Sequence, residues 1–388
     1  MDCSDGQSCQ SGNSKKVARG SIVPAPAFIG IRPAVTTINP QAPIMVTGAS
    51  GYIASWIVKY LLEAGHTVHG TVRDPAKPAL DYLRALSQAN GGRLRLFKAD
   101  LLDRGGFDAA MQGCERVMHT ASPFILSGFK DANEALVRPA VEGTRNVLEA
   151  ANRSVSVKRV VVTSSVAAVF GDNIDLRQVP GGAFTEAHWN TSSSLRHQPY
   201  SYSKIAAEKE AWAIGKQQSR WDLVTINPSF VLGPSLTTAT ASTSISTMQQ
   251  LGGGAMKAGA PALEFGVVDV RDVAQAHIKA GFTAAASGRY IVSNCEMSFL
   301  DMAVILREHF GKGYPFPRSQ LPKFLVWLVG PLVGGIQRSF VERNVGYPLR
   351  FDNGRGKREL GLQYRPAAQT LIEHFQQMLD DGLVRKRG

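Results

Sequence analysis

Cysteine is scarce in this 388-residue sequence, which excludes an architecture built on disulfides or on a cysteine-rich metal site. The four cysteines, Cys3, Cys9, Cys114 and Cys295, are too far apart for either. We therefore expect unpaired thiols, a cytoplasmic location and no bound metal.

Long hydrophobic runs are also missing. The longest strongly apolar stretch, 324–336, has 13 residues and contains Pro331 and three glycines, so it is too short to span a bilayer. We predict no membrane contact, and we interpret this stretch as a buried or pocket-lining helix. No apolar stretch follows a basic start, so we expect no secretory signal.

Acidic residues are outnumbered, because 31 Asp and Glu face 43 Lys and Arg, a formal net charge of +12. Such a surplus favours polyanions or anionic small molecules as partners. The basic residues are scattered, and the sequence has neither a zinc-ligand spacing nor an aromatic and basic RNA-binding motif. We expect no nucleic acid partner and interpret the charge as suited to a phosphorylated cofactor or a solvated surface.

Residues 1–42 are rich in Ser, Gly, Pro and Ala and lack a hydrophobic period, so we predict a flexible leader. An organelle transit peptide is an alternative, although the acidic Asp2 and Asp5 are unusual in one. From residue 43, β-branched runs alternate with segments of helical period. The expected strands are 44–47, 67–73, 93–98, 116–120, 158–165 and 223–226, and the expected helices are about 52–64, 79–89 and 132–151.

This alternation predicts an α/β protein with a doubly wound parallel sheet, the Rossmann fold of dinucleotide-binding proteins. We expect 43–235 to form the dinucleotide-binding domain. Because the alternation weakens beyond Pro234, we expect 236–388 to form mainly a smaller, interleaved C-terminal substrate-binding domain. A strand and a helix reappear at 267–280, so about 265–293 is expected to return to the first domain.

A glycine-rich turn follows the first strand, where such folds bind a pyrophosphate. Gly48 permits a tight turn, Gly51 lets the backbone approach the phosphates, and the small Ala54 lets the following helix pack on the strand. The Gly-x-x-Gly-x-x-Ala pattern alone also fits an ordinary glycine turn. The flanking strand and apolar helix favour a cofactor site.

The end of the second strand indicates which cofactor is bound. Arg73 stands where an arginine accommodates the 2′-phosphate of NADPH, and Lys77 follows closely. Asp74, one residue on, keeps NADH open as an alternative. Asp100 closes the third strand, where it suits the adenine amino group or simply caps a helix.

Tyr200 and Lys204 are four residues apart on an expected helix, which puts both side chains on one face. An ammonium group near a phenol lowers the phenol pKa from about 10 toward the working pH, which makes the tyrosine a usable proton donor or acceptor. Ser164 and Ser165 end a valine-rich strand at the sheet edge that binds ligands, where a serine can hydrogen-bond a substrate oxygen. Each of these patterns also occurs by chance.

Two further strand ends, at 119–123 and 227–234, are expected to border the nicotinamide. His119 and His277 are interpreted as structural. The expected cofactor-binding residues are Gly48, Ser50, Gly51, Tyr52, Ile53, Arg73, Lys77, Asp100, Leu101, Thr120, Ala121, Ser122, Tyr200, Lys204, Pro228 and Val231.

Over about 43–384 the chain resembles the extended short-chain dehydrogenases, because these elements occur in their order. It is most similar to the branch of cinnamoyl-CoA reductase, dihydroflavonol reductase and related carbonyl reductases, on the motifs Val72-Arg73-Asp74-Pro75, His119-Thr120-Ala121-Ser122-Pro123, Thr163-Ser164-Ser165 and Lys357-Arg358-Glu359-Leu360-Gly361. The resemblance implies an NADPH-dependent oxidoreductase and selects Ser165 over Ser164 as the catalytic serine. In that mechanism hydride passes to a carbonyl carbon, Tyr200 protonates the oxygen, Ser165 orients it, and Lys204 holds the ribose.

Two other kinds of function stay open. Nucleotide-sugar epimerases or dehydratases and hydroxysteroid dehydrogenases use the same fold. A nucleotide-sugar enzyme must bind a second pyrophosphate, and the segment 235–254 has only one cationic residue near it, Lys257, just beyond its end. A non-catalytic NADPH-sensing regulator is the other alternative, although it has no need of Ser165, Tyr200 and Lys204 together.

Departures from the branch bear on the substrate. Dihydroflavonol reductases carry an asparagine five residues after the catalytic serine, where this chain has Phe170. Cinnamoyl-CoA reductases carry Asn-Trp immediately before the tyrosine, whereas this chain has Gln198 and Pro199 at these positions. We therefore predict a compact, largely apolar aldehyde or ketone as the small-molecule substrate of a monomer or homodimer. The expected pocket residues are Phe124, Phe170, Phe230 and part of 324–336.

Overall fold

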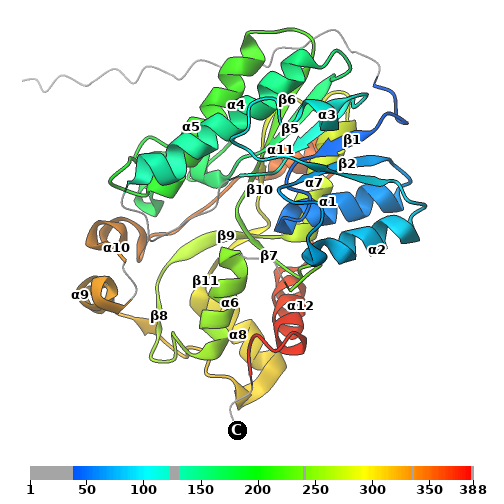
Figure 1. The fold of residues 1–388 in the computed structure, drawn as a ribbon. Helices are drawn as coiled ribbons and strands as arrows, with labels where there is room; N and C mark the ends of the chain where they lie inside the picture. Colours follow the sequence, from blue (N-terminus) through cyan, green and yellow to red (C-terminus); the bar gives the residue numbers. More distant parts are fainter. Residues whose placement is uncertain (1–37, 123–130, 239–241, 334–335, 386–388) are drawn as a thin grey trace, which may run out of the picture.

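The computed structural model describes residues 38–122, 131–238, 242–333 and 336–385 (Figure 1). Most of the predicted leader and Phe124 lie outside these ranges. The end of the predicted leader already contacts the folded chain. The backbone carbonyl of Asn39 accepts a hydrogen bond from Arg116 Nη1 at 3.2 Å, and Ala42 is buried.

Seven parallel strands form the central sheet, in the order β10-β6-β5-β4-β1-β2-β3. Successive residues face opposite sides, so that Val161 packs on one face while Val160 and Val162 pack on the other. The order reverses between β1 and β4, the point at which such sheets bind ligands. The predicted doubly wound parallel sheet is confirmed. The strands are β1 Ile44–Val46, β2 Val68–Val72, β3 Leu94–Lys98, β4 Arg116–His119, β5 Arg159–Thr163, β6 Asp222–Pro228 and β10 Gly288–Val292.

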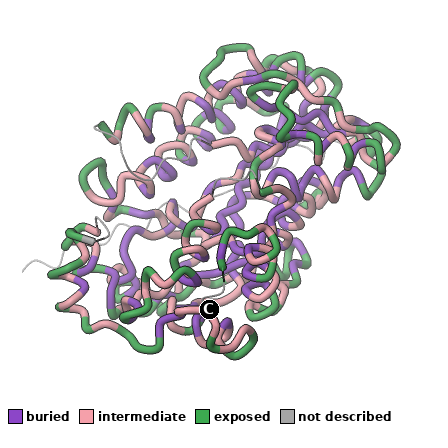
Figure 2. Tube along the Cα trace, turned by 60° about the horizontal axis from the view of Figure 1, so that its bottom comes forward, coloured by how far each residue is buried: buried purple, intermediate pink, exposed green. Residues whose placement is uncertain are grey.

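Helices cover both faces of this sheet, which is why its strands are largely buried, with the exception of the edge strand β3 (Figure 2). One face carries α1 Tyr52–Glu63, α2 Asp81–Ala89, α7 Val270–Phe282 and α11 Gly354–Leu360, and the other carries α3 Asp108–Met111, α4 Arg138–Arg153 and α5 Pro199–Lys216. Two expected helices begin with a different winding, because η1 Pro78–Leu80 is a 3₁₀ turn before α2 and η2 Asn133–Val137 is a π-helical turn before α4.

The C-terminal part is built around a three-stranded sheet in the order β11-β9-β7, on which three helices bury an apolar core. The sheet strands are β7 Phe230–Leu232, β9 Glu264–Asp269 and β11 Cys295–Ser298, and the helices are α6 Thr243–Gly253, α8 Phe299–Phe310 and α12 Ala367–Asp380. The remaining elements are β8 Ala260–Pro261 and β12 Gln320–Leu321, which pair, helices α9 Lys323–Val333 and α10 Arg338–Asn344, and the 3₁₀ turns η3 Val166–Ala168, η4 Asn173–Gln178 and η5 Gly311–Gly313.

The chain passes between the two sheets more than once. After β9, helix α7 packs beside α1 on the seven-stranded sheet, and β10 extends that sheet beside β6. The next strand, β11, pairs with β9 in the small sheet. Helix α7 and β10 therefore belong with the seven-stranded sheet, whereas β9 belongs to the small sheet, and the expected return of 265–293 to the first domain stays a prediction. The domain boundary near residue 235 stays a prediction.

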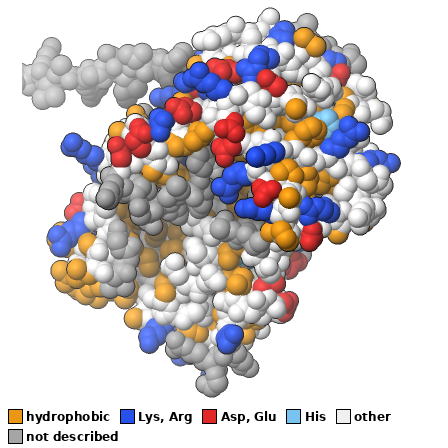
Figure 3. Space-filling view, in the orientation of Figure 1, with side chains coloured by type: hydrophobic (Ala, Val, Ile, Leu, Met, Phe, Trp, Pro, Cys, Tyr) orange, Lys and Arg blue, Asp and Glu red, His pale blue; other side chains and the backbone are white. Residues whose placement is uncertain are grey.

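The interpretation of 324–336 as a buried or pocket-lining helix is wrong. In α9, Val326 packs against α10, but Phe324 and Leu332 are 67% and 87% exposed. Apolar residues surround this short helix, so only one side finds a packing partner. Figure 3 shows the resulting hydrophobic surface at the lower left. No helix in the described part of the chain is long and apolar enough to cross a bilayer.

Candidate active site

A cavity of about 940 Å³ lies at the carboxyl ends of the parallel strands and extends to the C-terminal part. The edge of the sheet where β1 and β4 diverge is therefore one end of the cavity. Every residue that the sequence analysis assigned to catalysis or to the cofactor lines it, with the exception of Lys77. Lys77 is exposed and stays outside the lining.

The turn after β1 requires glycine at its first position. Gly48 has a φ of +62°, and a Cβ there would lie 3.0 Å from the Cβ of Ala121. No side chain caps the start of α1, so the first amides of this helix lack a side-chain acceptor where they meet the cavity. Such amides, together with the helix dipole, suit the pyrophosphate of a dinucleotide.

Thr47 fixes the neighbouring strand end. Its Oγ1 accepts hydrogen bonds from the backbone amides of Thr120 and Ala121, both at 3.0 Å. It therefore donates its own hydrogen to Nδ1 of His119, 2.9 Å away. Burial lowers the pKa of His119 to about 3, which keeps the ring neutral and able to accept. This arrangement agrees with the interpretation of His119 as structural.

The charged residues after β2 have different surroundings. Arg73 is exposed at the cavity, and no ion pair or hydrogen bond holds it within the described residues. Asp74 does not line the cavity, and its carboxylate accepts a hydrogen bond from the backbone amide of Ala76 at 3.0 Å. Asp100 lines the cavity while it accepts the amide of Leu102 at 3.0 Å. The geometry therefore favours Arg73 over Asp74 as the group that meets a cofactor.

Tyr200 and Lys204 both reach the cavity from the first turns of α5. Lys204 Nζ donates to Ser122 Oγ at 2.9 Å and lies 5.5 Å from the centroid of the Tyr200 ring. Burial raises the pKa of Tyr200 to about 12 and lowers the pKa of Lys204 to about 8. The predicted lowering of the Tyr200 pKa is therefore wrong, because desolvation by burial shifts this pKa upward. Tyr200 is a neutral phenol at physiological pH, suited to donating a proton.

The two serines after β5 differ in their partners. Ser164 Oγ donates to the fully buried Glu208 at 2.5 Å, and Glu208 also pairs with Arg289 at 2.6 Å. Among the described residues, Ser165 Oγ only accepts a hydrogen bond, from the backbone amide of Ala167 at 3.1 Å, and its own hydrogen has no acceptor there. The choice of Ser165 as the catalytic serine stays a prediction. Asn227 donates to Glu208 and to the backbone carbonyl of Ser165, so the buried network also holds this strand end.

The other end of the cavity is aromatic. Phe170 and Phe230 line it as expected, whereas α9 does not, and Phe124 lies outside the described residues. The sequence analysis missed Phe265, Leu349 and Phe351, which also line this end. Phe351 packs 5.3 Å from Phe170 by ring centroids, although 181 residues separate them in sequence. No motif marks these residues, and only their apolar character could have suggested them.

Comparisons with known proteins agree with this geometry. The model of the NAD dependent epimerase/dehydratase family matches residues 44–292. The chain is 44% identical to cinnamoyl-CoA reductase CAD2 of Medicago truncatula over 284 residues, 72% of this chain and 82% of that protein. It is 41% identical to tetraketide alpha-pyrone reductase 1 of Arabidopsis thaliana over 280 residues, 71% of this chain and 83% of that protein.

A solved reductase structure has a similar fold. Yeast methylglyoxal/isovaleraldehyde reductase Gre2 complexed with NADPH superimposes with a TM-score of 0.69 at 28% identity, covering 88% of this chain and 100% of that chain. The fold therefore agrees over most of the length. The chain belongs to the NAD dependent epimerase/dehydratase family and, within it, to the oxidoreductase branch of extended short-chain dehydrogenases that includes the cinnamoyl-CoA reductases.

Proposed function

We propose that this oxidoreductase uses NADPH to reduce the carbonyl group of a compact, largely apolar aldehyde or ketone to an alcohol, with Ser165, Tyr200 and Lys204 as catalytic residues. The observation that carries the proposal is the meeting of these three residues in one cavity whose far end is aromatic. The buried, neutral phenol of Tyr200 is the natural proton donor there.

The cofactor end of the cavity suits NADPH. The uncapped start of α1 offers backbone amides to the pyrophosphate, and Gly48 allows the chain to turn closely around it. Arg73 is available for a two-pronged contact with the 2′-phosphate. The NADPH complex of the yeast reductase supports the same choice of cofactor.

Each catalytic residue has a separate task. NADPH supplies a hydride to the carbonyl carbon. Tyr200 gives its phenolic proton to the carbonyl oxygen and regains one from water, while the Ser165 hydroxyl donates a hydrogen bond that stabilises the negative charge as it develops on that oxygen. Lys204, held by Ser122, would hydrogen-bond the nicotinamide ribose of bound cofactor and would keep a positive charge beside the reacting groups.

The charge of the cavity favours a small substrate. Arg73 and Lys204 are the basic residues among the described residues of its lining, and both are engaged with the cofactor in this proposal. A coenzyme A thioester or a nucleotide sugar brings further phosphates that would find no basic partner there. Coenzyme A thioester reduction is the second candidate, because the names of several relatives favour it.

The test is a screen of NADPH oxidation against aromatic and branched aliphatic aldehydes and ketones, cinnamoyl-CoA and dihydroflavonols. We expect turnover of the simple carbonyls and little or none of the other two classes. Tyr200→Phe should lower turnover by about two to four orders of magnitude while NADPH binding stays nearly intact, because a positioned proton donor is lost. Efficient turnover of cinnamoyl-CoA alone would select the second candidate, and a Tyr200→Phe variant within a few-fold of the wild type would refute the mechanism.

A further inference from the structure

Gln198 has an unusual backbone conformation immediately before the catalytic helix. Its φ of 53° and ψ of 58° are left-handed, and no other non-glycine residue in the described ranges has a positive φ. Such a conformation is unfavourable for a residue with a side chain and persists only where surrounding contacts enforce it. Gln198 is the residue before α5 and lies two positions before Tyr200, so the strain is stored at the start of the helix that carries the proton donor.

The side chain of Gln198 is fully engaged with the protein. Its Nε2 donates to the backbone carbonyl of Gly171 and to Oδ1 of Asp172, both at 2.6 Å. Its Oε1 accepts from Ser201 Oγ at 3.3 Å, and its backbone carbonyl accepts the amide of Tyr202 at 3.0 Å. Although Gln198 lines the cavity, its amide is committed to these partners and not to a substrate.

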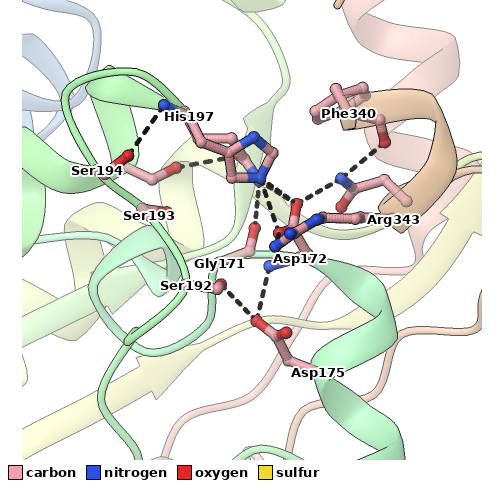
Figure 4. Close-up of polar contacts among 12 residues, drawn as sticks. Gly171, Asp172, Asp175, Ser192, Ser193, Ser194, His197, Phe340 and Arg343 are labelled. Carbon is pink, nitrogen blue, oxygen red and sulfur yellow. Dashed lines mark hydrogen bonds and ion pairs between the residues drawn. The ribbon is translucent and has the colours of Figure 1, made fainter. Parts of the chain in front are cut away.

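Asp172 is the centre of these contacts (Figure 4). It is completely buried and accepts hydrogen bonds from Nε2 of His197 at 2.8 Å and Nδ2 of Asn344 at 2.7 Å, in addition to the one from Gln198. Arg343 lies 3.6 Å from its carboxylate. Because Asn344 and Arg343 belong to α10, Asp172 joins the start of the catalytic helix to the C-terminal part of the molecule.

We propose that Gln198, held by Asp172, is a positioning residue for Tyr200. The inference rests on the proposed function, because it assumes that Tyr200 donates the proton. Pro199 and Tyr200 continue directly from the left-handed residue, so the contacts of Gln198 set the direction in which α5 begins. A displacement of about 1 Å in a reacting group lowers turnover by as much as about 100-fold, which makes such a constraint valuable for the chemical step.

Two substitutions of the same residue separate backbone strain from the side-chain contacts. Both variants lose the side-chain contacts, but Gln198→Ala still places a Cβ on a residue with positive φ, whereas Gln198→Gly adopts a positive φ without strain. We expect kcat to fall about 10- to 100-fold in both variants, with NADPH dissociation constant and carbonyl KM changed less than about three-fold. Gln198→Gly removes the strain, so it is the variant expected to remain folded.

Ser192→Ala is the matched control within the same cluster. Ser192 Oγ donates to Asp175 at 2.6 Å, and Asp175 accepts the backbone amide of Asp172, but neither contacts Gln198. Kinetics and thermal unfolding of the three variants, with Tyr200→Phe in parallel, give the test. A kcat within two-fold of the wild type in both Gln198 variants, or an equal loss in Ser192→Ala, overturns the positioning role. If Tyr200→Phe itself keeps its activity, the proposed function fails instead.

Discussion

The two ends of the cavity are built in different ways. At the cofactor end, backbone turns at Gly48 and at 120–122 meet through Thr47, and each turn is a contiguous stretch that follows one strand. At the substrate end, side chains from separate segments meet, among them Phe170 and Phe351. Backbone hydrogen bonds tolerate little variation, whereas an aromatic wall accepts exchanges of similar volume. Substrate preference can therefore change while the cofactor site stays as it is.

Arg73→Asp tests the cofactor end of the cavity. Of the three substitutions that compare the two ends, it has the largest expected effect, on the preference for NADPH over NADH. It replaces a charge-assisted contact with repulsion from the 2′-phosphate, so the preference for NADPH over NADH should fall by about 100-fold or more. Specificity constants for both cofactors measure it. Lys77→Asp is the matched control, because Lys77 is exposed nearby but outside the cavity lining, and it should change the preference less than about three-fold. Equal use of both cofactors by the wild type would contradict the role of Arg73.

Phe351→Ala tests whether the substrate end is independent of the cofactor end. Loss of the ring removes apolar contact with the substrate, so KM for an aromatic aldehyde should rise about ten-fold. The dissociation constant for NADPH, measured by fluorescence titration, should stay the same. Phe184→Leu is the control, since Phe184 packs 6.1 Å from Phe351 by ring centroids without lining the cavity. A parallel loss of NADPH affinity in Phe351→Ala would show that the two ends are coupled.

Lys204 lies between the two ends of the cavity, and Lys204→Met tests how its buried charge affects the free energy of unfolding. This is the smallest of the three expected effects. Burial lowers the pKa of Lys204 to about 8, while the unfolded chain keeps the ordinary value of 10.5, so the unfolded state binds more protons between these two values. The Lys204 contribution to the free energy of unfolding therefore rises with pH across this window, and the buried charge is destabilising below it. Lys204→Met should raise the free energy of unfolding at pH 7 by about 1 kcal/mol, since loss of the Ser122 hydrogen bond offsets part of the gain.

Denaturant unfolding from pH 7 to 10.5 without NADPH checks this expectation. The charge penalty of the wild type should disappear as the pH rises from about 8 to 10.5, so the stability advantage of Lys204→Met should fall over this range and reverse, leaving the loss of the Ser122 hydrogen bond. Lys209→Met is the control, because Lys209 is exposed on the same helix and should give no such trend. A pH-independent difference would place the Lys204 ammonium in a more solvated setting than its burial indicates.

The same contrast explains what could be predicted from the sequence. The glycine turn, Arg73 and the spacing of Tyr200 and Lys204 are local patterns, and the parallel sheet follows from the alternation of strands and helices. Phe351 could not be found, because its place in the cavity depends on packing with residues far away in the chain. The Tyr200 pKa was predicted in the wrong direction, since spacing reveals a neighbouring charge but not the extent of desolvation.

The position of β10 at the edge of the seven-stranded sheet has a consequence for protein engineering. A cut near residue 235 would separate β10 from β6 and leave the backbone edge of β6 unpaired. Exchange of the C-terminal part with a relative as one cassette would therefore break the cofactor-binding sheet as well. Altered substrate preference is better sought by substituting individual side chains of the aromatic wall.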